Sequence, residues 1–201
     1  RDLPIAVIHQ SGHFGALNSA ALARAGIGPG TPNPEGGVIR RRAGSPVPNG
    51  VLEENAFFHS LGRIMPKLTL EQSMDWLEKA QQLYLEFGYT TVQDGRSDAA
   101  AIASAMAAAE SRRLVIDVVS YPDILQLGDG ALANKLKFSR SYTNRFRIGG
   151  VKLTLDGSPQ GKTAWLTEPY LVPPDGQQPG YRGYGVLSDV RANEQVAKAI
   201  H

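Results

Sequence analysis

The stretch "TLEQSMDWLEKAQQLYLEFGYTTVQDGRSDAAAIASAMAAAESRRLVIDVVSY", residues 69–121, decides the fold because helical and strand-like segments alternate along it. Thr69 and Gln72 form a capping-box pattern at the start of the first helical segment, which ends at Gly88. The later predicted segments are, in order, a strand at 89–94, a helix at 97–113 and a strand at 114–121. This order is typical of parallel βα units, in either an open doubly wound sheet or a closed barrel.

The residues after 121 continue the pattern. We expect a helical stretch within 123–139 and a third strand in "RIGGVKLTLD", residues 147–156. Three strands alone do not distinguish a sheet from a barrel. A barrel needs eight strands and about 250 residues, so residues 69–201 would form only part of one.

Residues 1–68 look irregular by comparison. A short apolar run is followed by "NSAALARAG", a helix that Asn18 or Ser19 could cap and Gly26 could end. Glycine and proline then dominate through Gly50, which predicts mostly turns and loops.

Composition excludes several classes of protein. The 201 residues are 42% hydrophobic and 20% charged, as in an ordinary folded protein, and the net charge of +2 gives no reason to expect nucleic acid. The run at 40–42 of three arginines is expected in a solvated loop. The absence of cysteine and of any long apolar run predicts a cytoplasmic protein without membrane contact. The chain starts at Arg1 and ends inside a helix-like segment, so we expect it to be part of a longer protein.

The segment "GSPQGKT", residues 157–163, is similar to a phosphate-binding loop. It is one residue short between its glycines, and Pro159 has no N–H to donate. The prolines that follow also argue against the helix that such a loop should open. Nucleotide binding therefore stays a disfavoured alternative.

Lys152 lies in "VKLTLD", where alternation places Lys152, Thr154 and Asp156 on one strand face. On an open sheet this face would simply meet water. Inside a barrel it would be enclosed, and burial favours the neutral, nucleophilic amine of lysine. Such an amine can take up carbon dioxide as a carbamate, an oxygen ligand suited to divalent metals.

Four segments carry a family likeness: "SGHFGALNSAAL" (11–22), "EGGVIRRRAGSPVPNGVLEENA" (35–56), "GYTTVQDG" (88–95) and "GGVKLTLDGSPQGKTAWLTEPY" (149–170). In this order they resemble the metal-dependent amidohydrolases of the family-3, YtcJ-like group, which includes N-substituted formamide deformylases. The resemblance implies an α/β fold, with about strands 2–4 of a TIM-like (β/α)8 barrel preceded by an insertion after strand 1. It also implies hydrolysis of an amide or other non-peptide C–N bond by metal-activated water.

The same resemblance implies a divalent metal, usually zinc, as one or two ions. Lys152 matches the fourth-strand lysine ligand of the family. No His-x-His pair is present, and the four histidines, His9, His13, His59 and His201, do not fit the remaining ligand positions. We therefore expect this chain alone to be inactive. A non-catalytic, barrel-derived binding module is the second interpretation.

Other residues are weaker candidates for contact with a small amide substrate. His13 matches a family histidine that faces substrate, although a loop histidine bonding locally is nearly as good an explanation. Gln93, Asp94 and Asp156 follow or end strands, but the two aspartates also precede glycine, as turn residues do. Lys162 and Thr163 could reach a pocket or lie in an exposed loop. Open strand edges would allow a homo-oligomer.

Overall fold

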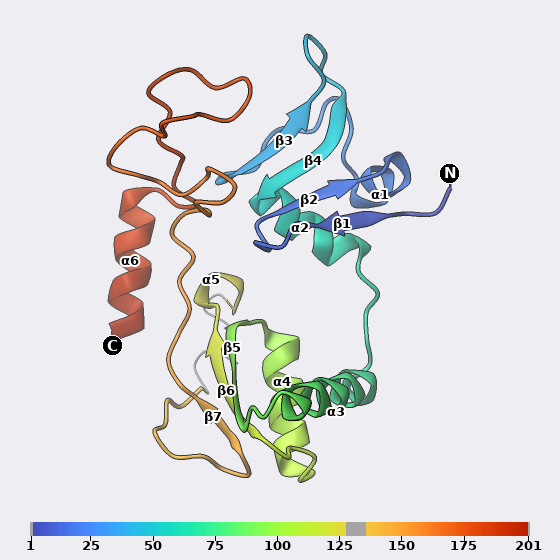
Figure 1. Cartoon of the computed structure of the whole chain (residues 1–201), viewed down its shortest axis with the longest axis vertical. Coiled ribbons are helices and arrows are strands. Elements are labelled where there is room, and N and C mark those ends of the chain that lie inside the picture. The colour runs from blue at the N-terminus through green and yellow to red at the C-terminus, as the bar shows by residue number, and fades with distance from the viewer. Residues whose placement is uncertain (1, 128–135, 201) are drawn as a thin grey trace. The chain divides into compact units, whose positions relative to one another are not determined.

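The computed structural model describes residues 2–127 and 136–200 (Figure 1). By their contacts the residues fall into two compact units. Unit 1 comprises Arg1–Pro66 and Leu155–Ala192, and unit 2 comprises Lys67–Thr154 and Asn193–His201. Each unit therefore combines residues from two separate parts of the chain.

Unit 1 is built on an antiparallel sheet in the order β1-β2-β4-β3. Its elements are β1 (Ala6–Ile8), β2 (Phe14–Leu17), α1 (Ser19–Ala25), β3 (Gly37–Arg41), β4 (Pro48–Glu54) and α2 (Asn55–Ile64). Leu17 and Leu52 from the sheet are buried with Leu22 of α1 and Phe57 of α2. This shared apolar core holds the two helices against the sheet.

The prediction that residues 1–68 are irregular is wrong for the described part of this range. Only the helix was visible locally: Asn18 accepts the Ala21 N–H as N-cap, and Gly26 ends α1 at φ 73°. The expected solvated loop at 40–42 is also wrong in part, because Arg40 lies in β3 and pairs with the buried Glu53. Short strands interrupted by glycine and proline carry little periodicity, which explains the error.

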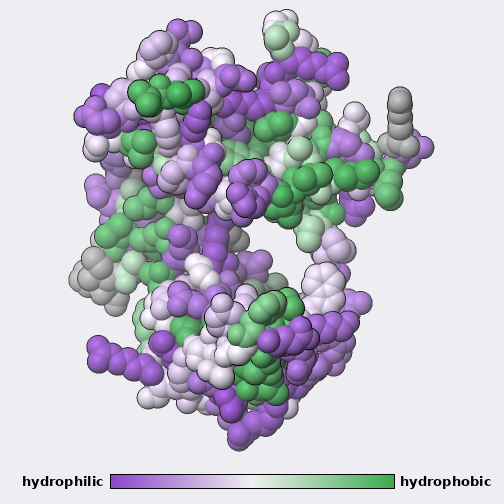
Figure 2. All heavy atoms as spheres, in the orientation of Figure 1, coloured by the Kyte–Doolittle hydropathy of each residue, from purple (hydrophilic) through white to green (hydrophobic). Residues whose placement is uncertain are grey.

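β1 is an edge strand of this sheet, and all of its residues are exposed. Its side chains, with those just before it, form an apolar patch, the green area near the N-terminus in Figure 2. Unpaired backbone groups beside apolar side chains are a surface on which further protein can pack.

Unit 2 contains the predicted βα units, with three parallel strands in the order β5-β6-β7. Its elements are α3 (Leu70–Glu86), β5 (Thr91–Ser97), α4 (Ala99–Glu110), β6 (Asp117–Pro122), α5 (Ile124–Leu127) and β7 (Phe146–Ile148). The capping box of Thr69 and Gln72 is formed as predicted. Ile102 of α4 packs with Val118 and Ile148, so one face of the sheet is covered by helix.

The third strand is much shorter than predicted. β7 ends at Ile148, and beyond it Lys152 makes an isolated parallel bridge to Asp123. Residues 151–156 lie outside the described strands, and Lys152 and Asp156 take part only in isolated bridges, so the strand predicted through them is wrong. Gly149 passes so close to Val119 and Tyr121 that a Cβ would lie 2.5 Å from the valine side chain. The chain therefore leaves the regular strand at this glycine.

Of the helix expected within 123–139, α5 forms the first turn, and residues 128–135 lie outside the described residues. Phe138 bridges to Ile148 in extended backbone instead of continuing a helix. α6 (Asp189–Ile200) forms as expected, its first residues belonging to unit 1 and its later residues to unit 2. Within the described residues, no helix has both the length and the apolar character to cross a membrane.

Candidate functional site

In unit 2, polar side chains gather where the parallel strands end. β5 contains a bulge between Asp94 and Ser97, where one extra residue stands against β6. Asp94 accepts from the Ser97 hydroxyl at 2.7 Å, and Ser97 also bonds to Ser120 of β6. Both serines are buried, so this network ties the two strand ends together.

The bulge also brings Arg96 to Asp123. The guanidinium Nε donates to Asp123 Oδ2 at 2.7 Å, and the aspartate is fully buried. The other oxygen of Asp123 accepts from the Leu125 N–H at 3.0 Å, at the start of α5. Both carboxylate oxygens of Asp123 therefore accept hydrogen bonds from other residues of unit 2.

The backbone of Lys152 bonds to the residues on either side of Asp123. Its N–H donates to the Pro122 carbonyl at 2.8 Å, and its own carbonyl accepts from Ile124 at 3.3 Å. The side chain is half-buried, neither enclosed within unit 2 nor fully in solvent, and forms no hydrogen bond or ion pair with the described residues. The hydroxyl of Thr154, two residues later, is buried without a partner among them.

Gln93 and Asp94 were both proposed from the sequence, but they lie on opposite faces of β5. Asp94 pairs in register with Ser120, on the face that Val92 turns toward the helices. Gln93 pairs with Val119, on the face away from them. Asp94 also accepts from the Arg96 N–H at 3.1 Å, so it stabilises the bulge, while the exposed Gln93 can meet a ligand.

In unit 1, His13 lies against a buried carboxylate that the sequence analysis did not identify. His13 Nδ1 is 2.7 Å from Glu54 Oε2, and Thr163 donates its hydroxyl hydrogen to Glu54 Oε1 at 2.6 Å. Glu54 is fully buried, whereas the His13 side chain keeps 25% of its surface exposed. The sequence signal was "LEEN" (52–55), two acids next to apolar residues at the start of a helix.

Glu53, the neighbour of Glu54, has its own partners. It is buried and accepts from Arg40 and from the Tyr184 hydroxyl, the latter at 3.1 Å. Burial raises the pKa of Tyr184, and the charge of Glu53 raises it further. Burial likewise raises the pKa of Tyr181 to about 12. These phenols remain protonated and serve as neutral groups.

Asp156, another sequence candidate, holds a turn. Its Oδ2 accepts from the Trp165 N–H at 2.9 Å, and its backbone bridges to Gly185. The Asp156 side chain is half-buried. Its hydrogen bond to Trp165 commits one carboxylate oxygen to the loop that follows.

The "GSPQGKT" loop does not present a phosphate cradle. Its amides donate inward: Lys162 to the Pro159 carbonyl, Thr163 to the Ser158 carbonyl, and Gly161 to the Ser158 hydroxyl. A phosphate would need these N–H groups free and convergent. Thr163 is buried and serves the carboxylate of Glu54, so the nucleotide alternative loses its donors.

Comparison with known proteins identifies the family of the chain. The model of the amidohydrolase family matches residues 1–201. The chain belongs to the amidohydrolase family. Its fold is similar to two solved structures of uncharacterized metal-dependent hydrolases. The one from Pyrococcus horikoshii OT3 has a TM-score of 0.65 and 23% identity, and the one from Pyrococcus furiosus has 0.59 and 22%.

These neighbours are longer proteins. The amidohydrolase chain is covered to 99% in both comparisons but spans only 37% and 39% of the neighbours' lengths. At this identity the likeness establishes the α/β fold. A search of the curated proteins finds no match.

The residues described here do not by themselves assemble a metal site. Among them, no group of three or more histidine, aspartate or glutamate side chains is placed to hold an ion. The backbone of Asp123 bridges to that of Lys152. The carboxylate of Asp123 already accepts a hydrogen bond from Arg96. The side chain of Lys152, the metal-ligand candidate from the sequence, forms no hydrogen bond or ion pair with the described residues.

Proposed function

We propose that the protein containing this chain is a metal-dependent hydrolase that cleaves amide or other non-peptide C–N bonds, of the family-3, YtcJ-like kind. In this proposal the chain supplies about strands 2–4 of a TIM-like (β/α)8 barrel. Support comes from the family match and from the parallel strands β5, β6 and β7. The single observation that carries the chemistry is the amine of Lys152 at their carboxyl ends, where barrel enzymes place their sites.

Lys152 is the proposed ligand for a divalent metal, with zinc as the expected ion, one or two per protein. Its neutral amine would add to carbon dioxide, forming an N–C bond and releasing a proton, and the resulting carbamate offers two oxygens. A metal bound there would supply an activated water, because zinc lowers the pKa of bound water toward about 7. The half-buried position permits both carbon dioxide access and partial exclusion of water.

Each unit is proposed by itself to offer polar contacts to a small amide substrate: Gln93 in unit 2, and His13 and Asp156 in unit 1. Gln93 is exposed on the face of β5 away from the helices, and its carboxamide can both donate to and accept from an amide. His13 can offer Nε2, because Nδ1 bonds to Glu54. Asp156 can offer Oδ1, because the hydrogen bond from Trp165 goes to Oδ2. Asp94 supports this arrangement indirectly by fixing the bulge of β5.

The test is hydrolysis by the full-length protein. We expect turnover of N-formyl and N-acyl amines, loss of turnover after chelation, and recovery with zinc. The same assay addresses a barrel-derived binding module, which would bind these amides without releasing an amine. Turnover that survives complete metal removal would contradict the proposal, and so would binding without turnover in the metal-loaded protein.

A further inference from the structure

Glu54 occupies an unusual place in unit 1. It is the last residue of β4 and the N-cap of α2, and its backbone has φ 47° and ψ −124°. A positive φ is strained for a residue with a side chain. The side chain makes no capping bond to the helix. The strained backbone instead directs the carboxylate inward, toward His13 and Thr163.

The hydrogen bond between Thr163 and Glu54 has a defined direction. The Thr163 hydroxyl accepts from the Ser158 N–H at 3.0 Å, so its own hydrogen is free to go to Glu54 Oε1. The remaining oxygen, Oε2, faces His13 Nδ1. An ionised carboxylate can only accept, so an ionised Glu54 requires a hydrogen on Nδ1.

The backbone reinforces this pairing. The Glu54 N–H donates to the His13 carbonyl at 2.8 Å, which fixes the two residues side by side. The loop that supplies Thr163 is tightly fitted: a Cβ on Gly157 would lie 2.5 Å from Glu54 Oε1. Within the described residues, Nε2 of His13 makes no hydrogen bond, and the ring is partly exposed.

We infer that Glu54 is a positioning residue that confines proton exchange of His13 to Nε2. With Nδ1–H held by the carboxylate, the neutral ring presents a lone pair at Nε2, and the charged ring presents a hydrogen there. Nε2 can thus accept from the N–H of an amide substrate or return a proton to the departing amine. Thr163 keeps Oε1 occupied, which leaves Oε2 for His13. This inference rests on the proposed function for its substrate, but the geometry stands without it.

The experiment measures the tautomer of His13 by long-range proton–nitrogen NMR in the full-length protein. The His13 signals are identified by difference from the His13→Gln variant, and pH is raised until the ring is neutral. We expect Nδ1–H to exceed Nε2–H by at least about tenfold, a ratio that one charge-assisted hydrogen bond supports. A neutral ring protonated at Nε2, with Nδ1 accepting from a protonated Glu54, would overturn the inference.

Two variants separate positioning from general folding effects. Glu54→Gln should reduce the tautomer ratio severalfold, because its amide can donate to Nδ1 as well as accept. Glu53→Gln is the matched control, since this adjacent buried carboxylate bonds to Arg40 and Tyr184, and it should leave the ratio unchanged. An unchanged ratio in folded Glu54→Gln would contradict the inference. If that variant does not fold, the wild-type tautomer still decides.

The measurement needs neither metal nor substrate. An inactive protein could show the Nδ1–H tautomer, and an active hydrolase could lack it. Failure of the inference is therefore distinguishable from failure of the proposed function.

Discussion

Thr163 donates its hydroxyl hydrogen to the buried carboxylate of Glu54 at 2.6 Å, although the two residues are 109 positions apart. This bond depends on how closely the loop 157–163 packs. A Cβ on Gly161 would lie 1.7 Å from the ring of Phe14. The loop that looked like a nucleotide motif is therefore a structural part of unit 1.

Gly161→Ala should destabilise the protein by about 1–3 kcal/mol, because the added methyl overlaps the Phe14 ring. Urea unfolding measures the change. Gly28→Ala is the matched control, since a Cβ there meets nothing within 4 Å. Equal stability of the two variants would show that the loop does not pack as described.

Tyr181 and Tyr184, two half-buried tyrosines of unit 1, should respond in opposite ways to loss of the hydroxyl. Tyr184→Phe removes a hydrogen bond to the charged Glu53 and should cost about 1.5–3 kcal/mol of unfolding free energy. Tyr181→Phe removes a buried hydroxyl that has no partner among the described residues, so stability should stay the same or rise. Chemical denaturation of both variants tests this, and a greater loss in Tyr181→Phe would contradict it.

Gln81 should be essential for unit 2. It is buried on α3, and its Oε1 accepts from the N–H groups of Val115 and Ile116 at 2.7 and 3.3 Å. Gln81→Leu leaves both N–H groups without this acceptor, and the buried Ile116 N–H alone should cost about 1–3 kcal/mol. Gln81→Glu keeps the acceptor and should cost less in the same denaturation experiment. A larger loss in the glutamate variant would contradict this account.

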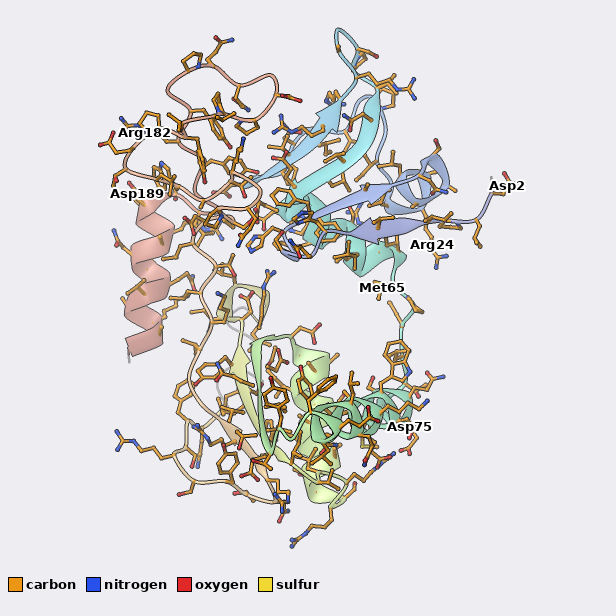
Figure 3. The ribbon with its side chains drawn as sticks, in the orientation of Figure 1. Asp2, Arg24, Met65, Asp75, Arg182 and Asp189 are labelled. Carbon is orange, nitrogen blue, oxygen red and sulfur yellow. The ribbon has the colours of Figure 1, made fainter. Side chains whose placement is uncertain are left out.

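Acid should weaken the contact between α3 and the segment that precedes β6. Arg113 pairs there with Glu71, Asp75 and Glu78 of α3, and Asp75 is labelled in Figure 3. The hydrogen bond from Arg113 holds the pKa of Glu78 below its ordinary value. A lowered folded-state pKa gives stability that is present above about pH 4.3, the unfolded value, and lost as pH falls through the folded value.

Thermal unfolding between about pH 5 and pH 3 tests this contribution. The wild type should lose more stability on acidification than Glu78→Gln, which lacks the titrating group. Glu110→Gln, at the end of α4, should follow the wild type. Identical pH dependence of wild type and Glu78→Gln would contradict the assigned role of Arg113.

Local signals predicted the elements that depend on nearby residues. Thr69 begins α3 through a capping box with Gln72, and Asn18 begins α1 by accepting from Ala21, all within a few residues. The parallel βα order in 69–121 also follows from local periodicity.

Elements that depend on distant partners were not predictable. β3 and β4 are defined by pairing, such as Val38 with Glu53, across a segment rich in glycine and proline. The strand around Lys152 was overpredicted because its alternation is regular, whereas packing of Gly149 on Tyr121 redirects the chain. Glu54 escaped notice because its partners, His13 and Thr163, lie 41 and 109 positions away.

The central claim is that Lys152 is a metal ligand, and metal content tests it most directly. Full-length wild type, Lys152→Ala and the control Lys79→Ala, an exposed residue of α3, would be loaded with zinc and analysed by elemental mass spectrometry. Full zinc occupancy is expected in wild type and Lys79→Ala, and a clear loss of zinc in folded Lys152→Ala. Equal zinc content in all three proteins would contradict it.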